Sequence, residues 1–105
     1  MSKNYLLIYS EQLATDIELM CQSIKAPSNT LFQIRKSSSS VYANISEAKY
    51  AHSKADFISK LQIALKECYE TEYWLELFVK TDIISEKTFD ELKNDCGKIR
   101  RVLIA

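Results

Sequence analysis

Apolar residues in this 105-residue chain recur at alternating steps of three and four. The clearest case is the segment 30–51, where the repeat runs through Leu31, Ile34, Ser38, Val41, Ile45 and Ala48. Steps of three and four keep side chains on one face of an α-helix, whereas a half-buried strand needs strict alternation. The spacing therefore predicts helices that each bury one face.

The same spacing divides the chain into four predicted helices, over residues of about 5–25, 30–51, 54–81 and 85–104. Pro27 disfavours helix at the residue before it, and the residues suited to cap the following helices are Ser28 or Asn29, Ser53 and Ser85. Sheet proteins need frequent glycine and proline turns, but this chain has one glycine and one proline. We predict a single all-α domain over residues 1–105, an antiparallel up-down-up-down four-helix bundle.

The third predicted helix carries apolar side chains on more than one side. Its main repeat consists of Phe57, Leu61, Ala64, Cys68, Thr71, Leu75 and Phe78. Two further stripes consist of Ile63, Trp74 and Leu77, and of Ile58, Leu65 and Tyr69. A helix that is apolar over a wide arc must be covered by more than one neighbour. We therefore expect the bundle to be a subunit of a homo-oligomer with Tyr73 and Trp74 in the interface. The alternative is that these aromatic side chains stack on nucleic-acid bases.

Four consecutive serines, Ser37 to Ser40, lie inside the second predicted helix. A serine run is typical of a flexible linker, but here the apolar repeat continues across it without a slip. Serine is a mediocre helix former, so a helix that contains four of them needs a packing reason. We expect the small side chains to let a neighbouring helix come close.

A polar stripe continues along the same helix through Ser40, Asn44 and Glu47. Residues three and four apart share a helical face, and this face borders the apolar repeat. We expect the stripe to make structural hydrogen bonds, between helices or across a subunit boundary. The alternative is a polar pocket or a partner site.

The formal net charge is zero, but the charges are unevenly distributed. Basic residues outnumber acidic ones between residues 26 and 66, and the reverse holds between 67 and 95. The candidates for a nucleic-acid-binding surface are Arg35, Lys36, Lys49, Lys54, Lys60, Lys66, Arg100 and Arg101. The alternative is an ordinary solvated surface. A strongly basic nucleic-acid-binding domain is excluded by the neutral total.

The sequence offers no catalytic, metal-binding or cofactor-binding pattern. His52 is the one histidine, whereas a di-iron site in a helical bundle needs two Glu-x-x-His motifs. A phosphate-binding loop needs glycines that this chain lacks. Glu67, Glu70, Glu72 and Glu76 on the third helix are best read as a solvated or interface face. We therefore expect no cofactor, no metal and no enzymatic activity.

The three cysteines, Cys21, Cys68 and Cys96, are far apart and form no Cys-x-x-Cys pair. The first twelve residues lack the apolar core of a signal peptide, and no stretch approaches the length of a membrane span. We expect a cytoplasmic protein without membrane contact, in which the cysteines are small, reduced core residues.

Two stretches resemble a known family in both order and spacing. Residues 31–54, LFQIRKSSSSVYANISEAKYAHSK, contain a Q-I-R opening, a serine-rich run and A-N-I-x-E. Residues 57–77, FISKLQIALKECYETEYWLEL, contain F-x-x-x-L-x-I-A-x-x-E followed by E-T-x-Y-W-L-E-L, and the fourth helix is preceded by I-S-E. Together these motifs resemble the 23S rRNA intervening-sequence protein family, also described as four helix bundle proteins.

This resemblance implies an antiparallel four-helix bundle that assembles as a ring-like homopentamer. A related branch resembles the accessory protein of diversity-generating retroelements, which implies RNA or DNA and a reverse-transcriptase-like protein as partners. The chain departs from that basic branch in its neutral net charge, and it has Glu47-Ala48 where many relatives have Glu-Gly. We expect an oligomeric protein that contacts nucleic acid or a nucleic-acid-handling partner. The alternative is a protein-interaction module without nucleic-acid contact.

Overall fold

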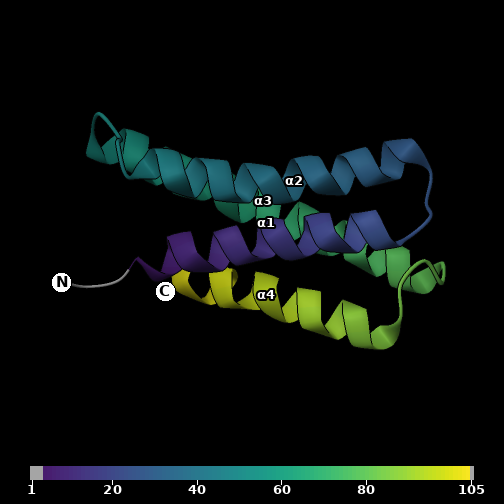
Figure 1. Cartoon of the computed structure of the whole chain (residues 1–105). Helices are drawn as coiled ribbons and strands as arrows, with labels where there is room; N and C mark the ends of the chain where they lie inside the picture. The colour runs from purple at the N-terminus through teal and green to yellow at the C-terminus, as the bar shows by residue number, and fades with distance from the viewer. Residues whose placement is uncertain (1–3, 105) are drawn as a thin grey trace.

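The computed structural model describes residues 4–104, which form four α-helices and, over that range, no strand. The helices are α1 (Tyr5–Ser23), α2 (Ser28–Ala48), α3 (Lys54–Lys80) and α4 (Glu86–Ile104) (Figure 1). The predicted all-α class is confirmed. No helix in this range is both long enough and apolar enough to cross a membrane.

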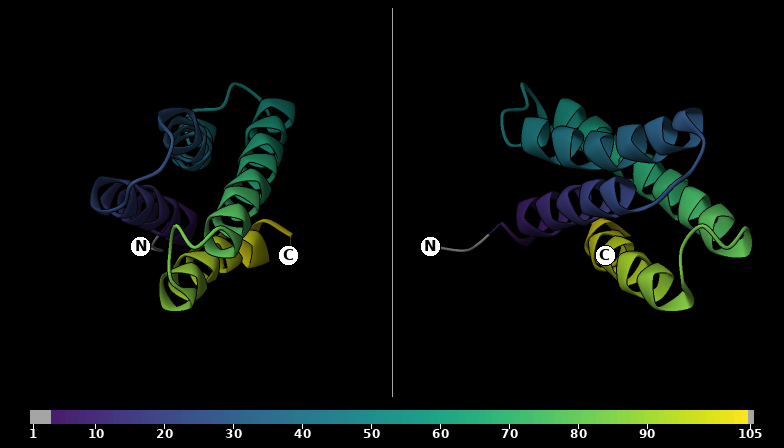
Figure 2. Two further views of the ribbon diagram at one scale, coloured as in Figure 1. Left: turned by 90° about the vertical axis from the view of Figure 1, so that its right-hand side faces the viewer. Right: turned by 45° about the vertical axis from the view of Figure 1, so that its right-hand side comes forward.

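The helices pack as a closed square around one core. Helix α1 contacts α2 and α4, and helix α3 contacts the same two (Figures 1 and 2). The bundle measures 43 × 25 × 20 Å along its principal axes, and α1 begins at the end of the molecule where α4 ends. Each helix thus has two sides covered by its neighbours and an outer side that no other helix covers.

The core consists of the residues that the three-four spacing selects. The fully buried side chains in it include Leu13 and Ile17 of α1, Ile34 and Val41 of α2, Leu75 and Phe78 of α3, and Ile99 of α4. All three cysteines are free and buried, which confirms their expected role in the core. Removing this apolar surface from water is the main contribution to folding.

Two helix ends differ from the prediction. Helix α2 begins at Ser28 with Pro27 in the cap position, and no side chain caps it, so the expected cap from Ser28 or Asn29 is wrong. Proline suits this place because the fixed φ of Pro27 leads into the helix and its missing N–H costs nothing there. Helix α2 then ends at Ala48, three residues early, because the backbone N–H of Lys49 already bonds in a turn to the carbonyl oxygens of Ser46 and Glu47.

The other starts follow the expected chemistry. Ser53 Oγ accepts a hydrogen bond of 3.1 Å from the backbone N–H of Asp56, and Ser85 Oγ accepts one of 3.1 Å from that of Thr88. Between α3 and α4 the chain turns through Asp82, whose φ of 61° lies in the left-handed region that aspartate tolerates. Each cap satisfies a backbone N–H at a helix start.

The serine run is helical, and part of it lies at the contact between α2 and α3. Ser37 and Ser38 are buried, and both hydroxyls bond to the carbonyl oxygen of Ile34. The Ser37 Oγ also lies 2.8 Å from Thr71 Oγ1 of α3. Two side chains this small allow the helices to approach closely at a point where both hydroxyls stay hydrogen-bonded.

This contact predicts the effect of a larger side chain within the run. Ser37→Leu should lower the free energy of unfolding by about 1–3 kcal/mol, because it overpacks the contact and removes the hydrogen bond between Ser37 and Thr71, which leaves Thr71 bonded only to the Glu67 carbonyl oxygen. Ser39→Leu on the exposed side of the same run should change that free energy by less than about 0.5 kcal/mol. Urea denaturation followed by circular dichroism measures both, and equal effects would contradict the packing described above.

Candidate functional site

Large apolar side chains lie on the outer side of α3. We define the α3 outer face as Ile63, Tyr73, Trp74 and Leu77. Tyr73 is 59% exposed, Ile63 40% and Leu77 38%, and Trp74 is half-buried. These residues include one of the extra stripes expected from the sequence, and among the described residues Ile63, Tyr73 and Leu77 stay exposed while Trp74 packs partly against the core. An exposed group of large apolar residues is typical of an interaction surface.

The Trp74 side chain is the unusual member of this face. The Tyr73 ring meets it edge-on, with ring centroids 5.0 Å apart and planes at 76°. The Trp74 Nε1 atom is buried, and no hydrogen-bond acceptor for it exists within the described residues. A buried indole N–H normally has an acceptor, because leaving a donor unpaired costs about 1–3 kcal/mol.

The polar stripe of α2 makes contacts inside the chain. Asn44 Nδ2 donates to the Ser40 carbonyl oxygen at 2.8 Å and to Ser40 Oγ at 3.1 Å, both within α2. Glu47 accepts a hydrogen bond of 3.0 Å from Lys60 Nζ across to α3. The Asn44 bonds thus stay within α2, and the Glu47–Lys60 contact joins α2 to α3. A small cavity beside them is lined by Glu47, Tyr50, His52, Asp56 and Lys60.

The eight basic candidates do not gather on one face, because three of them pair with carboxylates in three different places. Arg35 pairs with Glu18 between α1 and α2, Lys60 with Glu47 between α2 and α3, and Arg100 with Glu72 between α3 and α4. The exposed candidates, for which the described part of the chain shows no ion pair, are Lys36, Lys49, Lys54, Lys66 and Arg101.

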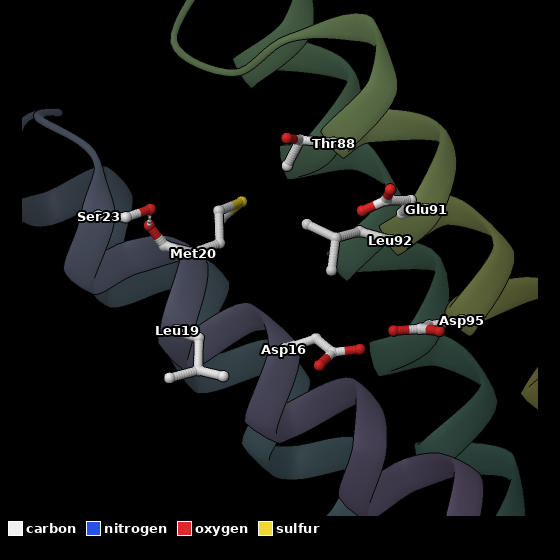
Figure 3. Close-up of a pocket in the computed structure, with 8 residues that line it drawn as sticks. All are labelled: Asp16, Leu19, Met20, Ser23, Thr88, Glu91, Leu92 and Asp95. Atoms are coloured by element: carbon white, nitrogen blue, oxygen red, sulfur yellow. Dashed lines mark hydrogen bonds between the residues drawn. The ribbon is translucent and has the colours of Figure 1, made fainter.

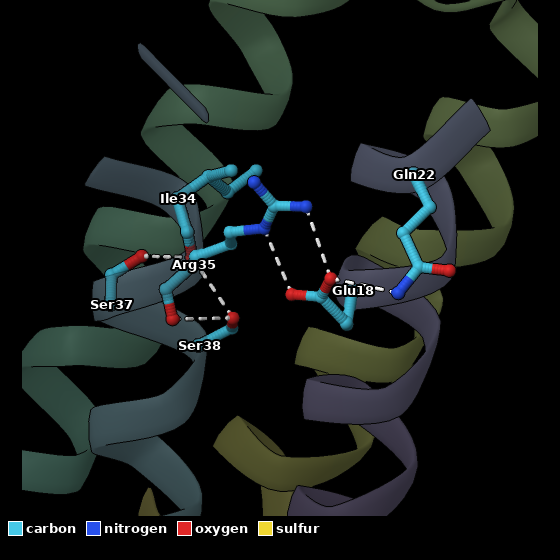
Figure 4. A network of polar contacts seen from close by, with 6 residues as sticks. All are labelled: Glu18, Gln22, Ile34, Arg35, Ser37 and Ser38. Carbon is cyan, nitrogen blue, oxygen red and sulfur yellow. Dashed lines mark hydrogen bonds and ion pairs between the residues drawn. The ribbon is translucent and has the colours of Figure 1, made fainter. Parts of the chain in front are cut away.

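Figure 4 shows the ion pair between α1 and α2 in detail. Arg35 Nε and Nη2 donate to the two oxygens of Glu18 at 2.9 and 3.0 Å, and Gln22 Nε2 adds a third bond to Glu18 at 3.0 Å. The Arg35 bonds, and then that of Gln22, lower the pKa of Glu18. This two-pronged geometry fixes the guanidinium plane and leaves Arg35 less available to a phosphate.

Lys36 and Lys66 are exposed lysines that lie outside the ion pairs of the described residues, and the charges of both influence one carboxylate. They belong to different helices, yet both act on the Glu67 carboxylate. Burial raises the pKa of Glu67, with Glu70 adding to the effect, while Lys66 and Lys36 partly oppose it. Two of the predicted basic residues, on different helices, thus act on the same carboxylate.

A cavity between α1 and α4 contains a carboxyl pair that the sequence analysis missed. It measures about 350 Å³ and is lined by Asp16, Leu19, Met20, Ser23, Thr88, Glu91, Leu92 and Asp95. Figure 3 shows Asp16 and Asp95 pointing toward each other from the two helices. Burial, together with the hydrogen bond and charge of Asp16, raises the pKa of Asp95 to about 7. In the sequence, each of these two aspartates directly precedes a residue of an apolar repeat. That pattern is too common to indicate a site.

His52 takes a capping position. Its backbone N–H donates to Asp56 Oδ2 at 3.2 Å, and the N–H of Asp56 donates to Ser53 Oγ. The three residues therefore close the turn before α3, in contacts that use the backbone of His52. This geometry is that of a helix start.

Two comparisons with known proteins find relatives. Residues 7–105 match the sequence model of a family described as 23S rRNA-intervening sequence protein. The fold is similar to a crystal structure from Bacteroides thetaiotaomicron, a protein of unknown function from the S23 ribosomal protein family. The two chains are 39% identical, the match covers 94% of each, and the TM-score is 0.86. A search of curated proteins finds no match.

The carboxyl pair predicts how stability depends on pH. Asp95 is protonated more readily in the folded chain than in the unfolded one, so between about pH 4 and pH 7 the folded state binds more protons. The contribution of Asp95 to the free energy of unfolding should therefore be greatest below about pH 4. It should fall as pH rises toward 7, by at most about 1.4 kcal/mol per pH unit.

Asp95→Asn should remove this slope, because it keeps a hydrogen-bonding side chain without the charge. Asp90→Asn on the exposed side of α4 is the matched control and should keep the slope. Urea titrations between pH 4 and pH 8, with a chelator present, measure both variants. A slope unchanged in Asp95→Asn would show that the carboxyl pair does not carry the proton.

Proposed function

The chain belongs to the 23S rRNA-intervening sequence protein family, and we propose that it works as a non-enzymatic assembly protein. In this proposal the chain is an antiparallel up-down-up-down bundle that associates with its own copies into a ring-like homo-oligomer, a pentamer as expected from the family resemblance. The free, buried cysteines are compatible with a reducing cytoplasm, which stays a prediction.

The α3 outer face is the observation that carries this proposal. Tyr73 and Trp74 are the residue types that dominate the energetics of interfaces, and Ile63 and Leu77 extend the apolar area beside them. Association through this face would remove the exposed apolar surface of Tyr73 and Leu77 from water.

A second candidate function is nucleic-acid contact, supported by the exposed lysines that stay outside the ion pairs. Lys36 on α2 and Lys66 on α3 both act on the Glu67 carboxylate, and a ring would repeat these two lysines in every subunit. The family description refers to ribosomal RNA, so a structured RNA is the natural probe. Under the alternative proposal the lysines are ordinary surface, and the ring contacts only proteins, such as a reverse-transcriptase-like partner.

The assembly proposal predicts the effect of charges placed on the α3 outer face. Light scattering should give the unchanged protein a mass of five chains. Tyr73→Glu combined with Leu77→Glu should give single chains with helical circular dichroism intact, because two buried carboxylates cost at least about 2 kcal/mol at a hot spot.

The matched control for this experiment is Tyr5→Glu combined with Ile8→Glu. These residues form an equally exposed aromatic–aliphatic pair on α1, a helix that does not touch α3. The control should assemble normally. A monomeric unchanged protein, or equal dissociation of the control, would rule out assembly through this face.

The nucleic-acid candidate predicts a salt dependence that Lys36 and Lys66 share. Affinity for a structured RNA hairpin should fall with rising salt, because bound phosphates release counterions. Lys36→Glu combined with Lys66→Glu should weaken binding and reduce the log–log salt slope by about 0.7–0.9 for each lost phosphate contact.

Lys25→Glu combined with Lys87→Glu makes the same change in net charge at two other exposed positions. It should leave most of the slope in place in gel-shift titrations at several salt concentrations. If the unchanged protein shows no binding even at about 50 mM salt, the protein-interaction alternative is favoured instead.

A further inference from the structure

Two of the three cysteines, far apart in the sequence, meet inside the bundle. Cys68 of α3 and Cys96 of α4 are both fully buried, and Cys68 Sγ donates a weak hydrogen bond of 3.5 Å to the Cys96 carbonyl oxygen. Glu72 lies one turn beyond Cys68 on α3. One ligand atom from each of the three residues lies within 4.8 Å of the other two.

This set of atoms suits a thiophilic metal ion. Thiolates bind Zn²⁺ at about 2.3 Å and carboxylate oxygens bind it at about 2.0–2.2 Å, so two sulfurs on one tetrahedral ion lie about 3.8 Å apart. The side chains of Cys68, Glu72 and Cys96 would thus need to move by about 1 Å or less to share an ion. Soft sulfur ligands select zinc-like or cadmium-like ions over magnesium or calcium.

The charges around the cluster are compatible with a divalent ion. Glu72 is paired with Arg100 of α4, whose Nη2 donates to Glu72 Oε1 at 3.0 Å. With neutral thiols, this pair leaves no net charge in the cluster. A divalent ion that displaces the two thiol protons also leaves none, so binding adds no unpaired charge to a buried place. Arg100 would then hold the carboxylate ligand in orientation, as outer partners of metal ligands commonly do.

The third cysteine, Cys21, lies in a different environment from Cys68 and Cys96. Cys21 is buried in α1, and among residues 4–104 it belongs to no group of three ligand-type side chains. Cys68, Glu72 and Cys96 form the single such group found in that range. The chain therefore contains its own control for a buried cysteine that only packs.

We propose that Cys68, Glu72 and Cys96 form a binding site for a divalent cation of the zinc and cadmium class, linking α3 to α4. Each ion bound releases the two thiol protons to solvent, forms two metal–sulfur bonds and one metal–oxygen bond, and changes no oxidation state. A tetrahedral ion has a fourth position, which a water molecule carried in with the ion would fill. The site lies inside the bundle, so it does not depend on the proposed assembly or on nucleic-acid contact.

Cadmium titration of the full-length, reduced chain tests the site, because cadmium bound to thiolate absorbs in the ultraviolet. The absorption should saturate at one ion per chain, and Zn²⁺ should compete with it. Zn²⁺ should also raise the melting temperature, since an ion that binds only the folded state stabilises it. Cys21→Ser should behave as the unchanged protein does.

Two variants address the ligands separately. Cys96→Ser should lose at least about tenfold in cadmium affinity, and Glu72→Gln should lose about tenfold while leaving both thiols in the core. Circular dichroism checks that each variant is folded, and if Cys96→Ser is not, Glu72→Gln decides. The proposal is overturned if folded, reduced protein shows no thiolate absorption at stoichiometric cadmium. It is equally overturned if Glu72→Gln binds as tightly as the unchanged chain, or if Cys21→Ser loses as much affinity as the ligand variants.

Discussion

The close contact between α2 and α3 sets the geometry on which the other features depend. At Ser37 and Thr71 two small hydroxyl side chains meet at 2.8 Å, so the helices approach without a buried polar atom being left unpaired. This contact aligns Glu47 with Lys60 farther along the same pair. It also sets which side of α3 is left uncovered, and that side carries Tyr73 and Trp74. A bulky residue at the contact would change all of these positions together.

The ion pairs between helices show how a chain with zero net charge uses its basic residues. Arg35, Lys60 and Arg100 each hold two helices together through a carboxylate, so part of the basic charge in the sequence is used to fix the bundle. The Arg35–Glu18 and Lys60–Glu47 pairs are partly exposed and add little stability, whereas Arg100–Glu72 is more buried, and the two-pronged arginine pairs define register. The basic residues left for the proposed nucleic-acid contact are those outside these pairs, such as Lys36, Lys66 and Arg101. A ring of neutral chains would bind phosphates through local asymmetry of charge, not through its total.

Sequence periodicity predicted the helices and their buried faces because both depend on residues three and four apart, which are visible locally. It predicted the caps at Ser53 and Ser85 for the same reason. The predicted end of α2 is three residues later than the observed end, because the chain already turns at Lys49. The pairs Asp16–Asp95 and Cys68–Cys96 could not be predicted, because each depends on the register of one helix against another. That register follows from the packing of whole helices and has no local signal.

Helix α3 carries the exposed α3 outer face and the buried Cys68, and these two features lie on different sides of the helix. Tyr73 and Leu77 point away from the core, whereas Cys68 is fully buried and lies against α4. A metal ion at Cys68 and Cys96 would join α3 to α4, the helix that also carries Asp95 in the carboxyl pair with α1. It would stiffen one side of the square and leave the α3 outer face unchanged. Assembly through the α3 outer face should therefore be the same with and without zinc, because the ion would act between α3 and α4 while Tyr73 and Leu77 face away from the core.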